Sequence, residues 1–206
     1  MSVITCRSNQ LRGARERSGR RPEESVYTYV GGTTGAWEVT DQFARRGARL
    51  VPITRLDVHG DHLNRSPLGT AWILSGLVRN TRYVTREEFA VPEKRIRACA
   101  PPAPTCAALI PIRRSPDWWQ LGREARHEIL EAQSQQTPSG LRYLSAIIRR
   151  WQHRLDLSEQ FDCVTWFEYE PRDSAAFDDL LAEWRTSEEW KFVDRECDIR
   201  LVRSAW

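Results

Sequence analysis

The order of the expected elements predicts an α+β protein with a largely antiparallel sheet. Strand patterns dominate the first half of the chain, whereas the second half alternates apolar strands with amphipathic helices. The strand–helix–strand order at the C-terminal end fits a ferredoxin-like unit. A length of 206 residues allows one domain or two small fused units, but no convincing internal sequence repeat supports a duplication.

Three strands are expected in the first half. Residues Val26–Gly32 alternate in polarity and end in glycines, as a strand and turn do. Gly35–Phe43 and Ala48–Val58 have similar patterns, and His59–Gly69 is rich in turn residues. The next segment, Thr70–Ala90, is ambiguous, because at its start a strand pattern competes with a helical spacing of Trp72, Ser75, Gly76, Arg79 and Tyr83.

The second half begins after a proline-rich connector, residues 100–105. Cys106–Arg114 is an apolar strand, and a helix follows, capped by Ser115 or Asp117. Thr137 predicts the cap of a second helix with Pro138 in its first turn. Its buried stripe would be Leu141, Leu144, Ile148, Trp151 and Leu155.

The C-terminal end completes the pattern. Phe161–Pro171 is apolar on both faces, which predicts a strand covered on both sides. Asp173–Trp190 predicts a helix and Arg195–Arg203 a closing strand.

Charge and composition exclude several classes of protein. Residues 1–25 hold six Arg against three Glu, and the rest of the chain is balanced. The body therefore has no electrostatic reason to bind nucleic acid, and we expect the Arg-rich head, 1–25, to be a disordered extension of a domain over 26–206. No apolar run is long enough to cross a membrane. Five cysteines without a C-x-x-C pair suit a reducing compartment, so a cytoplasmic location is expected.

Several motifs carry a resemblance to a known family. Those of the second half are "ALIPIRRSPDWWQL", "GLRYLSAIIRR", "FDCVTWFEYEP" and "SEEWKFVDRECDIRLVR". Together they resemble the short-chain branch of the chlorite dismutase family. The motifs "GGTTGAWEV" and "AWILSGLVRNTRYV" match its first half, so the resemblance covers about residues 26–203. The expected domain divides into a first half, 26–100, and a second half, 106–206.

The resemblance implies a dimeric α+β barrel built from ferredoxin-like units, with haem b in its second half. It also implies a small anionic substrate, chlorite in the true chlorite dismutases. A proximal His would ligate the iron, a Glu would bond the other nitrogen of its ring, and a distal Arg would stand on the opposite face.

Carried over residue by residue, the distal arginine falls on Arg149 and the carboxylate on Glu189. Without the resemblance, each would be read as a surface charge. Trp118 and Trp119 match the tryptophan pair beside the haem, where core packing is the compatible simpler reading. Arg114 matches a Lys near a propionate, and Tyr83 is a candidate for the other propionate.

The chain departs from the family at the proximal position, which falls on Gln136. An amide is a poor ligand for haem iron compared with imidazole. His127 lies nine residues earlier, about 13 Å along a continuous helix at ~1.5 Å per residue, and His153 more readily fits a surface or interface bond. "DVHGDH", with Asp57, His59, Asp61 and His62, is a weaker candidate for a separate metal site.

The sequence therefore leaves two functions open. The first is a chlorite dismutase-like haem oxidoreductase that acts on chlorite, a peroxide or a nitrogen oxide with an altered or lost proximal ligand. The second is a haem-free member that serves as a small-molecule binding or scaffold module, or as an enzyme with another cofactor. Coproheme decarboxylase fits less well, because that branch usually has longer chains and a distal Gln where Arg149 stands. A homodimer is expected in either case.

Overall fold

The structure is a computed structural model of the whole chain, and it describes residues 25–60, 63, 65–78, 105–135, 147–154 and 160–204. The predictions for the head, Tyr83, Gln136 and the capping pair Thr137 and Pro138 therefore lie outside the described residues.

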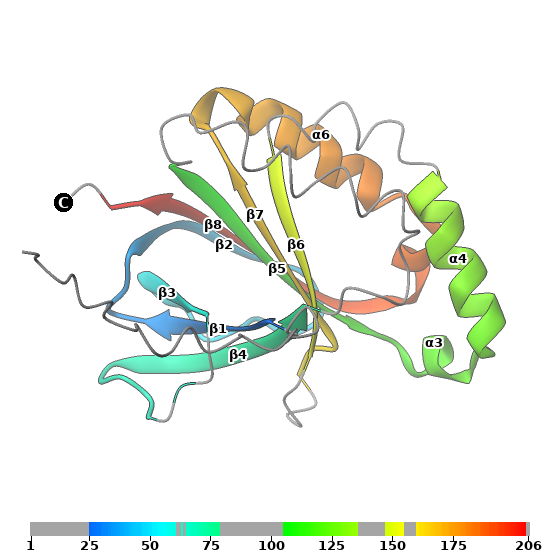
Figure 1. Cartoon of the computed structure of the whole chain (residues 1–206), viewed down its shortest axis with the longest axis horizontal. Coiled ribbons are helices and arrows are strands. Elements are labelled where there is room, and N and C mark those ends of the chain that lie inside the picture. The colour runs from blue at the N-terminus through cyan, green and yellow to red at the C-terminus, as the bar shows by residue number, and fades with distance from the viewer. Residues whose placement is uncertain are drawn as a thin grey trace, which may run out of the picture.

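Eight antiparallel strands close into a barrel (Figure 1) in the order β1-β3-β2-β8-β5-β7-β6-β4. The first four are β1 (Ser25–Gly32), β2 (Trp37–Arg46), β3 (Arg55–His59) and β4 (Thr70–Val78). The second four are β5 (Cys106–Arg114), β6 (Ile147–Arg154), β7 (Cys163–Tyr169) and β8 (Val193–Arg203). The helical elements are α3 (Pro116–Gln120), α4 (Arg123–Gln135), η1 (Pro171–Asp173), α6 (Ser174–Trp184) and η2 (Glu188–Phe192).

The strand order contains the same arrangement twice. Within the second half the order is β8-β5-β7-β6, that is fourth, first, third, second, and within the first half it is β4-β1-β3-β2. The second half has the β-α-β-β-α-β succession of a ferredoxin-like unit. The first half has no helix between β1 and β2, where only residues 33–36 intervene. The predicted α+β class with ferredoxin-like units is confirmed, and the duplication appears in the topology although not in the sequence.

Alternating side chains of the strands divide the core in two. One set fills the barrel, where the rings of Tyr29 and Trp37 lie 5.5 Å and 5.4 Å from that of Trp166. The other set lies on the outer face of β5 and β7, where α6 covers it through Phe177, Leu181 and Trp184. Figure 1 shows α6 lying across these strands. The strand β7 is therefore buried on both faces, as its sequence predicts.

The predicted helix after Thr137 is wrong over 147–154, where the structure has strand β6. This segment pairs with β7 from Ile147 to His153 and with β4 at Arg154 and His153. The apolar spacing of three and four residues is outweighed by closure of the barrel, because without β6 both β7 and β4 would be left with unpaired backbone edges. Ile147, Ile148 and Trp151 also suit a strand.

The other predicted strands and helices differ from the observed ones mainly in where they begin and end. The ambiguous segment begins as strand β4, and the strand predicted over Ala48–Val58 begins only at Arg55. The helix after Ser115 is interrupted at Leu121 and Gly122, which separate α3 from α4. Ser115 is the N-cap residue of α3, but its side chain makes no capping hydrogen bond. No helix among the described residues is long and apolar enough to span a membrane.

The burial of three cysteines leads to a first prediction. Cys106, Cys163 and Cys197 are free thiols in the sheet and are at most 9% exposed. Burial raises the pKa of Cys106 and of Cys197, although a hydrogen bond to each opposes the shift. The reactive form of cysteine is the thiolate, so we expect these thiols to resist iodoacetamide in the folded protein and to react fully in denaturant. Peptide mass spectrometry checks this thiol by thiol, and rapid modification of Cys197 in the native protein would contradict it.

Candidate functional site

A buried cluster of one arginine and two carboxylates joins three segments of the second half. Arg114 is the last residue of β5, Asp162 precedes β7, and Glu189 lies in η2. Arg114 and Glu189 are 5% and 0% exposed, and the side chain of Asp162 is 17% exposed. A guanidinium buried to this degree requires compensating charge, and both carboxylates supply it.

The guanidinium of Arg114 donates to both carboxylates. Its Nε lies 2.9 Å from Oε1 of Glu189, and its Nη2 donates to the same oxygen. Its Nη1 lies 2.5 Å from Oδ1 of Asp162. The backbone N–H of Arg114 also donates to Oδ2 of Asp162, at 2.7 Å. Asp162 therefore fixes both the main chain and the side chain of Arg114.

Local irregularity of the sheet aims Arg114 into this cluster. The pairing of β5 with β8 shifts register between Arg113 and Arg114, so that Arg114 lies opposite Val193. Such a bulge redirects the side chain that follows it. Arg113 instead binds the half-exposed carboxylate of Asp194, with Nε 2.8 Å from Oδ1. Immediately after β5, the N–H of Ser115 donates to the carbonyl of Phe192 at 2.6 Å, which holds η2 against the end of the strand.

Burial and charge act in opposite directions on the pKa values of this cluster. Burial alone would lower the pKa of Arg114, but the charges of Glu189 and Asp162 and the hydrogen bond to Glu189 raise it overall. The pKa of Asp162 is raised by burial, although Arg114 opposes this shift and the nearby charge of Glu189 adds to it. Arg114 is therefore a permanent cation here, shared by two carboxylates.

The two adjacent tryptophans lie in different environments. Trp118 in α3 is 3% exposed, and its ring centroid is 5.1 Å from Cζ of Arg114 and 5.5 Å from the ring of Phe192. Trp119 is 54% exposed, with Cζ of Arg126 5.5 Å from its ring. Trp118 thus belongs to the cluster around Arg114, whereas Trp119 lies on the exposed side of α3.

The structure brings together only some of the predicted site residues. Arg114 contacts both Glu189 and Trp118, and Arg149 of β6 occupies the register position opposite Phe167 of β7. The spacing of apolar residues predicted that Arg149 lies at the margin of a helix, but it lies on strand β6. Positions 83 and 136 lie outside the described residues.

Sequence reasoning missed Asp162. An acidic residue directly before an apolar strand is an ordinary strand boundary, and no local pattern shows that it pairs with a residue 48 positions earlier. Arg46 was missed for the same reason, because its Nη1 donates to the carbonyls of Trp190 and Val193 at 2.7 and 2.8 Å. It thereby connects β2 to η2, the element that carries Glu189.

The weaker metal site is only partly within the described residues. Nε2 of His59 lies 3.4 Å from Oδ2 of Asp57, and Asp61 and His62 are outside the described part. Within that part, no group of three or more His, Cys, Asp or Glu side chains could hold a metal ion. A small pocket near the loop between β2 and β3 is lined by none of the predicted site residues.

Comparison with solved structures places this fold among known proteins. A dimeric chlorite dismutase from Nitrobacter winogradskyi is 35% identical, with a TM-score of 0.71 over 86% of this chain and 99% of that chain. The chain belongs to the chlorite dismutase family. No protein-family model matches the sequence.

More distant chlorite dismutases share the fold. A variant of the enzyme from Candidatus Nitrospira defluvii, with an arginine replaced by lysine, is 18% identical with a TM-score of 0.60, over 89% of this chain and 93% of that chain. The same enzyme in complex with imidazole is 19% identical with a TM-score of 0.58, over 86% and 90%. The resemblance to the chlorite dismutase family that the motifs predict is confirmed.

The donor groups do not fit a histidine-ligated haem of the kind that chlorite dismutases imply. The residue to which the resemblance assigns the proximal position is Gln136, an amide. His127 lies on α4, nine residues before Gln136, which corresponds to about 13 Å along a continuous helix at ~1.5 Å per residue. Glu189, which would polarise an imidazole, already accepts hydrogen bonds from Arg114. The chain thus supplies this buried carboxylate with a cationic partner of its own.

Removing the shared cation is expected to destabilise the chlorite dismutase-like barrel strongly. Arg114→Met leaves two buried carboxylates without their cation, which costs about 3–5 kcal/mol of unfolding free energy. Adding Glu189→Gln to this variant should restore part of the loss, because the two residues interact directly. Urea unfolding measures each difference.

The matched control is Arg113→Met, the neighbouring residue whose ion pair with Asp194 is half-exposed. Its loss should be about 1 kcal/mol or less. Equal losses for Arg113→Met and Arg114→Met would contradict a special role of the buried cluster.

The raised pKa of Asp162 predicts a pH dependence of stability. Because this pKa is higher in the folded protein than in the unfolded chain, the stability due to Asp162 is present at low pH and lost as pH rises through the folded-state pKa. The unfolding free energy of the wild type minus that of Asp162→Asn should therefore increase as pH falls from about 7 to about 4. Denaturant titrations across this range measure it, and a difference that shrinks toward low pH would contradict the assignment.

Proposed function

We propose that this protein works without histidine-ligated haem, as a homodimeric small-molecule binding module built on the chlorite dismutase barrel. One observation carries the proposal. The buried carboxylate of Glu189 is paired within the chain with Arg114, while the position expected to bind iron has an amide. The dimeric relative supports the homodimer, and a cytoplasmic location follows from the cysteine content.

The cluster gives the proposed site a rigid base. Arg114 connects the end of β5 to η2 and to the residue before β7, and Arg46 connects η2 to β2. Residues held by several buried hydrogen bonds keep their geometry without a ligand, which reduces the entropy lost on binding. In this role Arg114 and Glu189 position the site, and neither has to give or take a proton.

The ligand of this module is proposed to be a small anion. Arg149 is the cation that the resemblance places in the site, and an arginine can hold a carboxylate or another oxyanion with two parallel hydrogen bonds. The guanidinium of Arg114 is already shared by Glu189 and Asp162. Arg149 is therefore proposed to supply the charge that selects the ligand.

A haem-dependent oxidoreductase is the second candidate, favoured by the relative from Nitrobacter winogradskyi, which is 35% identical and matched over 99% of its length. In that case haem b would supply redox chemistry toward chlorite, a peroxide or a nitrogen oxide. Arg149, Glu189, Trp118, Trp119, Arg114 and Tyr83 would surround it.

Titration with haem separates the two functions. We expect the wild-type protein to give no saturable Soret change at one haem per chain, because the amide of Gln136 is a poor iron ligand. Gln136→His should bind haem at least tenfold more tightly, a change of ~1.4 kcal/mol or more. Absorption spectra over a range of haem concentrations measure both proteins.

The matched control is Gln135→His, which adds a histidine one position away at the end of α4. It should bind haem no better than the wild type. If the wild type instead saturates at one haem per chain as tightly as Gln136→His, the haem-dependent oxidoreductase is the correct function.

A further inference from the structure

The loop between β2 and β3, residues 47–54, is fixed by a glycine turn, by two buried side chains and by hydrogen bonds to its backbone. Its turn requires Gly47, which has a φ of 65° and whose added Cβ would lie 2.9 Å from the carbonyl oxygen of Asp194. Leu50 and Ile53 anchor the loop in the barrel core, at 5% and 9% exposure. The loop is therefore part of the rigid barrel wall.

Two side chains take the place of a strand partner for this loop. Gln42 of β2 donates from Nε2 to the carbonyls of Leu50 and Val51 at 3.2 and 3.3 Å, and its Oε1 accepts the N–H of Ile53 at 3.2 Å. From the other side, Arg195 of β8 donates to the carbonyls of Ala48 and Arg49 at 2.9 and 3.3 Å. These bonds fix the backbone before and after Arg49.

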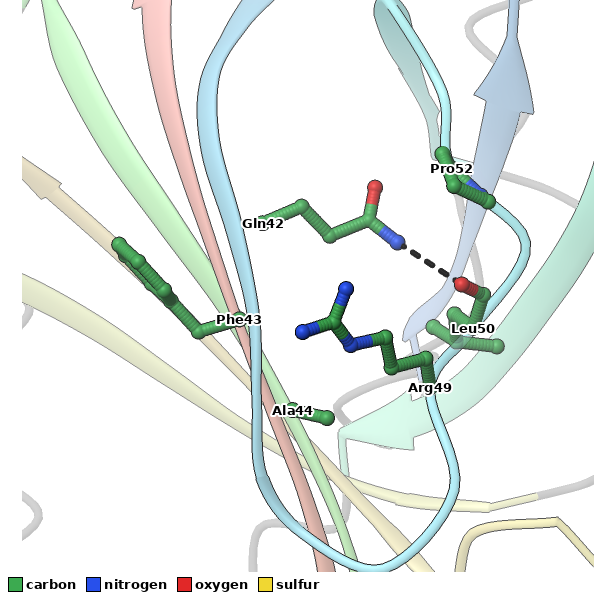
Figure 2. A pocket seen from close by; sticks show the side chains of 6 residues that line it. All are labelled: Gln42, Phe43, Ala44, Arg49, Leu50 and Pro52. Carbon is green, nitrogen blue, oxygen red and sulfur yellow. Dashed lines mark hydrogen bonds between the residues drawn. The ribbon is translucent and has the colours of Figure 1, made fainter.

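A small pocket with a volume of about 50 Å³ opens between this loop and β2 (Figure 2). Figure 2 shows the guanidinium of Arg49 extending from the loop toward β2, beside the amide of Gln42. Small-molecule sites usually occupy about 300–1,000 Å³, so this pocket has room for only one small group of a ligand, such as a single carboxylate. Its lining residues are Gln42, Phe43, Ala44, Arg49, Leu50 and Pro52.

Arg49 differs from the arginines around it. Arg46 and Arg195 donate to backbone carbonyls, and Arg45 lies 3.7 Å from a carboxylate oxygen of Asp198. Across the described residues, no carboxylate or carbonyl bonds the guanidinium of Arg49. No acidic residue occurs between Gln42 and Leu56, a stretch with four arginines. The pocket therefore presents an uncompensated positive charge.

We infer that this pocket binds a small oxyanion, a carboxylate or phosphate group, through the guanidinium of Arg49. The planar donor pair of arginine matches two oxygens of such a group. Because Gln42 and Arg195 already hold the backbone of the loop, little order is lost on binding. The site is separate from the Arg114 cluster, since β2 and β8 lie between the loop and β5 in the strand order.

The test is a residue-resolved NMR titration of the full chain with sodium phosphate and, separately, with sodium acetate, at constant ionic strength. Saturable shifts of the amides from Gln42 to Thr54 are expected with at least one anion, and the tighter one identifies the class. Arg49→Gln should weaken anion binding at least tenfold. The affinity of Arg49→Lys should lie between that of the wild type and that of Arg49→Gln. The melting temperature of Arg49→Gln should equal that of the wild type, because the side chain stabilises nothing else.

The matched control is Arg65→Gln, which removes an exposed arginine from the connection between β3 and β4. It should bind both anions as the wild type does. The inference is overturned if neither anion gives saturable shifts, if Arg49→Gln binds as tightly as the wild type, or if Arg65→Gln loses as much affinity.

Discussion

The second half of this protein depends on one buried cation, Arg114, placed between Asp162 and Glu189. Each partner comes from a different element, so the three side chains connect the end of β5, the start of β7 and η2. Charges removed from water in this way are tolerated only when all of them are paired. The bulge between β5 and β8, the contact of Trp118 and the attachment of η2 by Arg46 all follow from, or support, this arrangement.

Barrel closure is the second constraint, and it explains why two halves of different appearance form one fold. Both halves place their strands in the same relative order, although only the second has helices in both connections of its unit. The junctions are the long pairing of β2 with β8 and the short pairing of β4 with β6. Because a closed sheet has no unpaired edge, β6 must be a strand whatever its local preference.

These constraints decide what the sequence could predict. Strands β1, β5, β7 and β8 were predictable, because their alternating or continuous apolar patterns reflect which faces are buried. The strand β6 was not, because its partners β7 and β4 are distant and its apolar spacing also fits a helix. Arg114 and Glu189 were identified through the family resemblance. The sequence could not predict that these two residues pair, or that Asp162 joins them, because the contacts connect residues 75 and 48 positions apart.

The nature of the cation also determines how the cluster responds to pH. An unligated histidinium would lose its charge as the pH rises through neutrality, so a buried carboxylate paired with it would lose its cationic partner. A guanidinium remains charged throughout the physiological range, and here the carboxylates hold the pKa of Arg114 above its ordinary value. Arg114 therefore remains a cationic partner of Glu189 throughout that range. The hydrogen bonds from Arg114 to Glu189 and Asp162 therefore connect the end of β5 to η2 and to the start of β7 through a cation that does not titrate in this range.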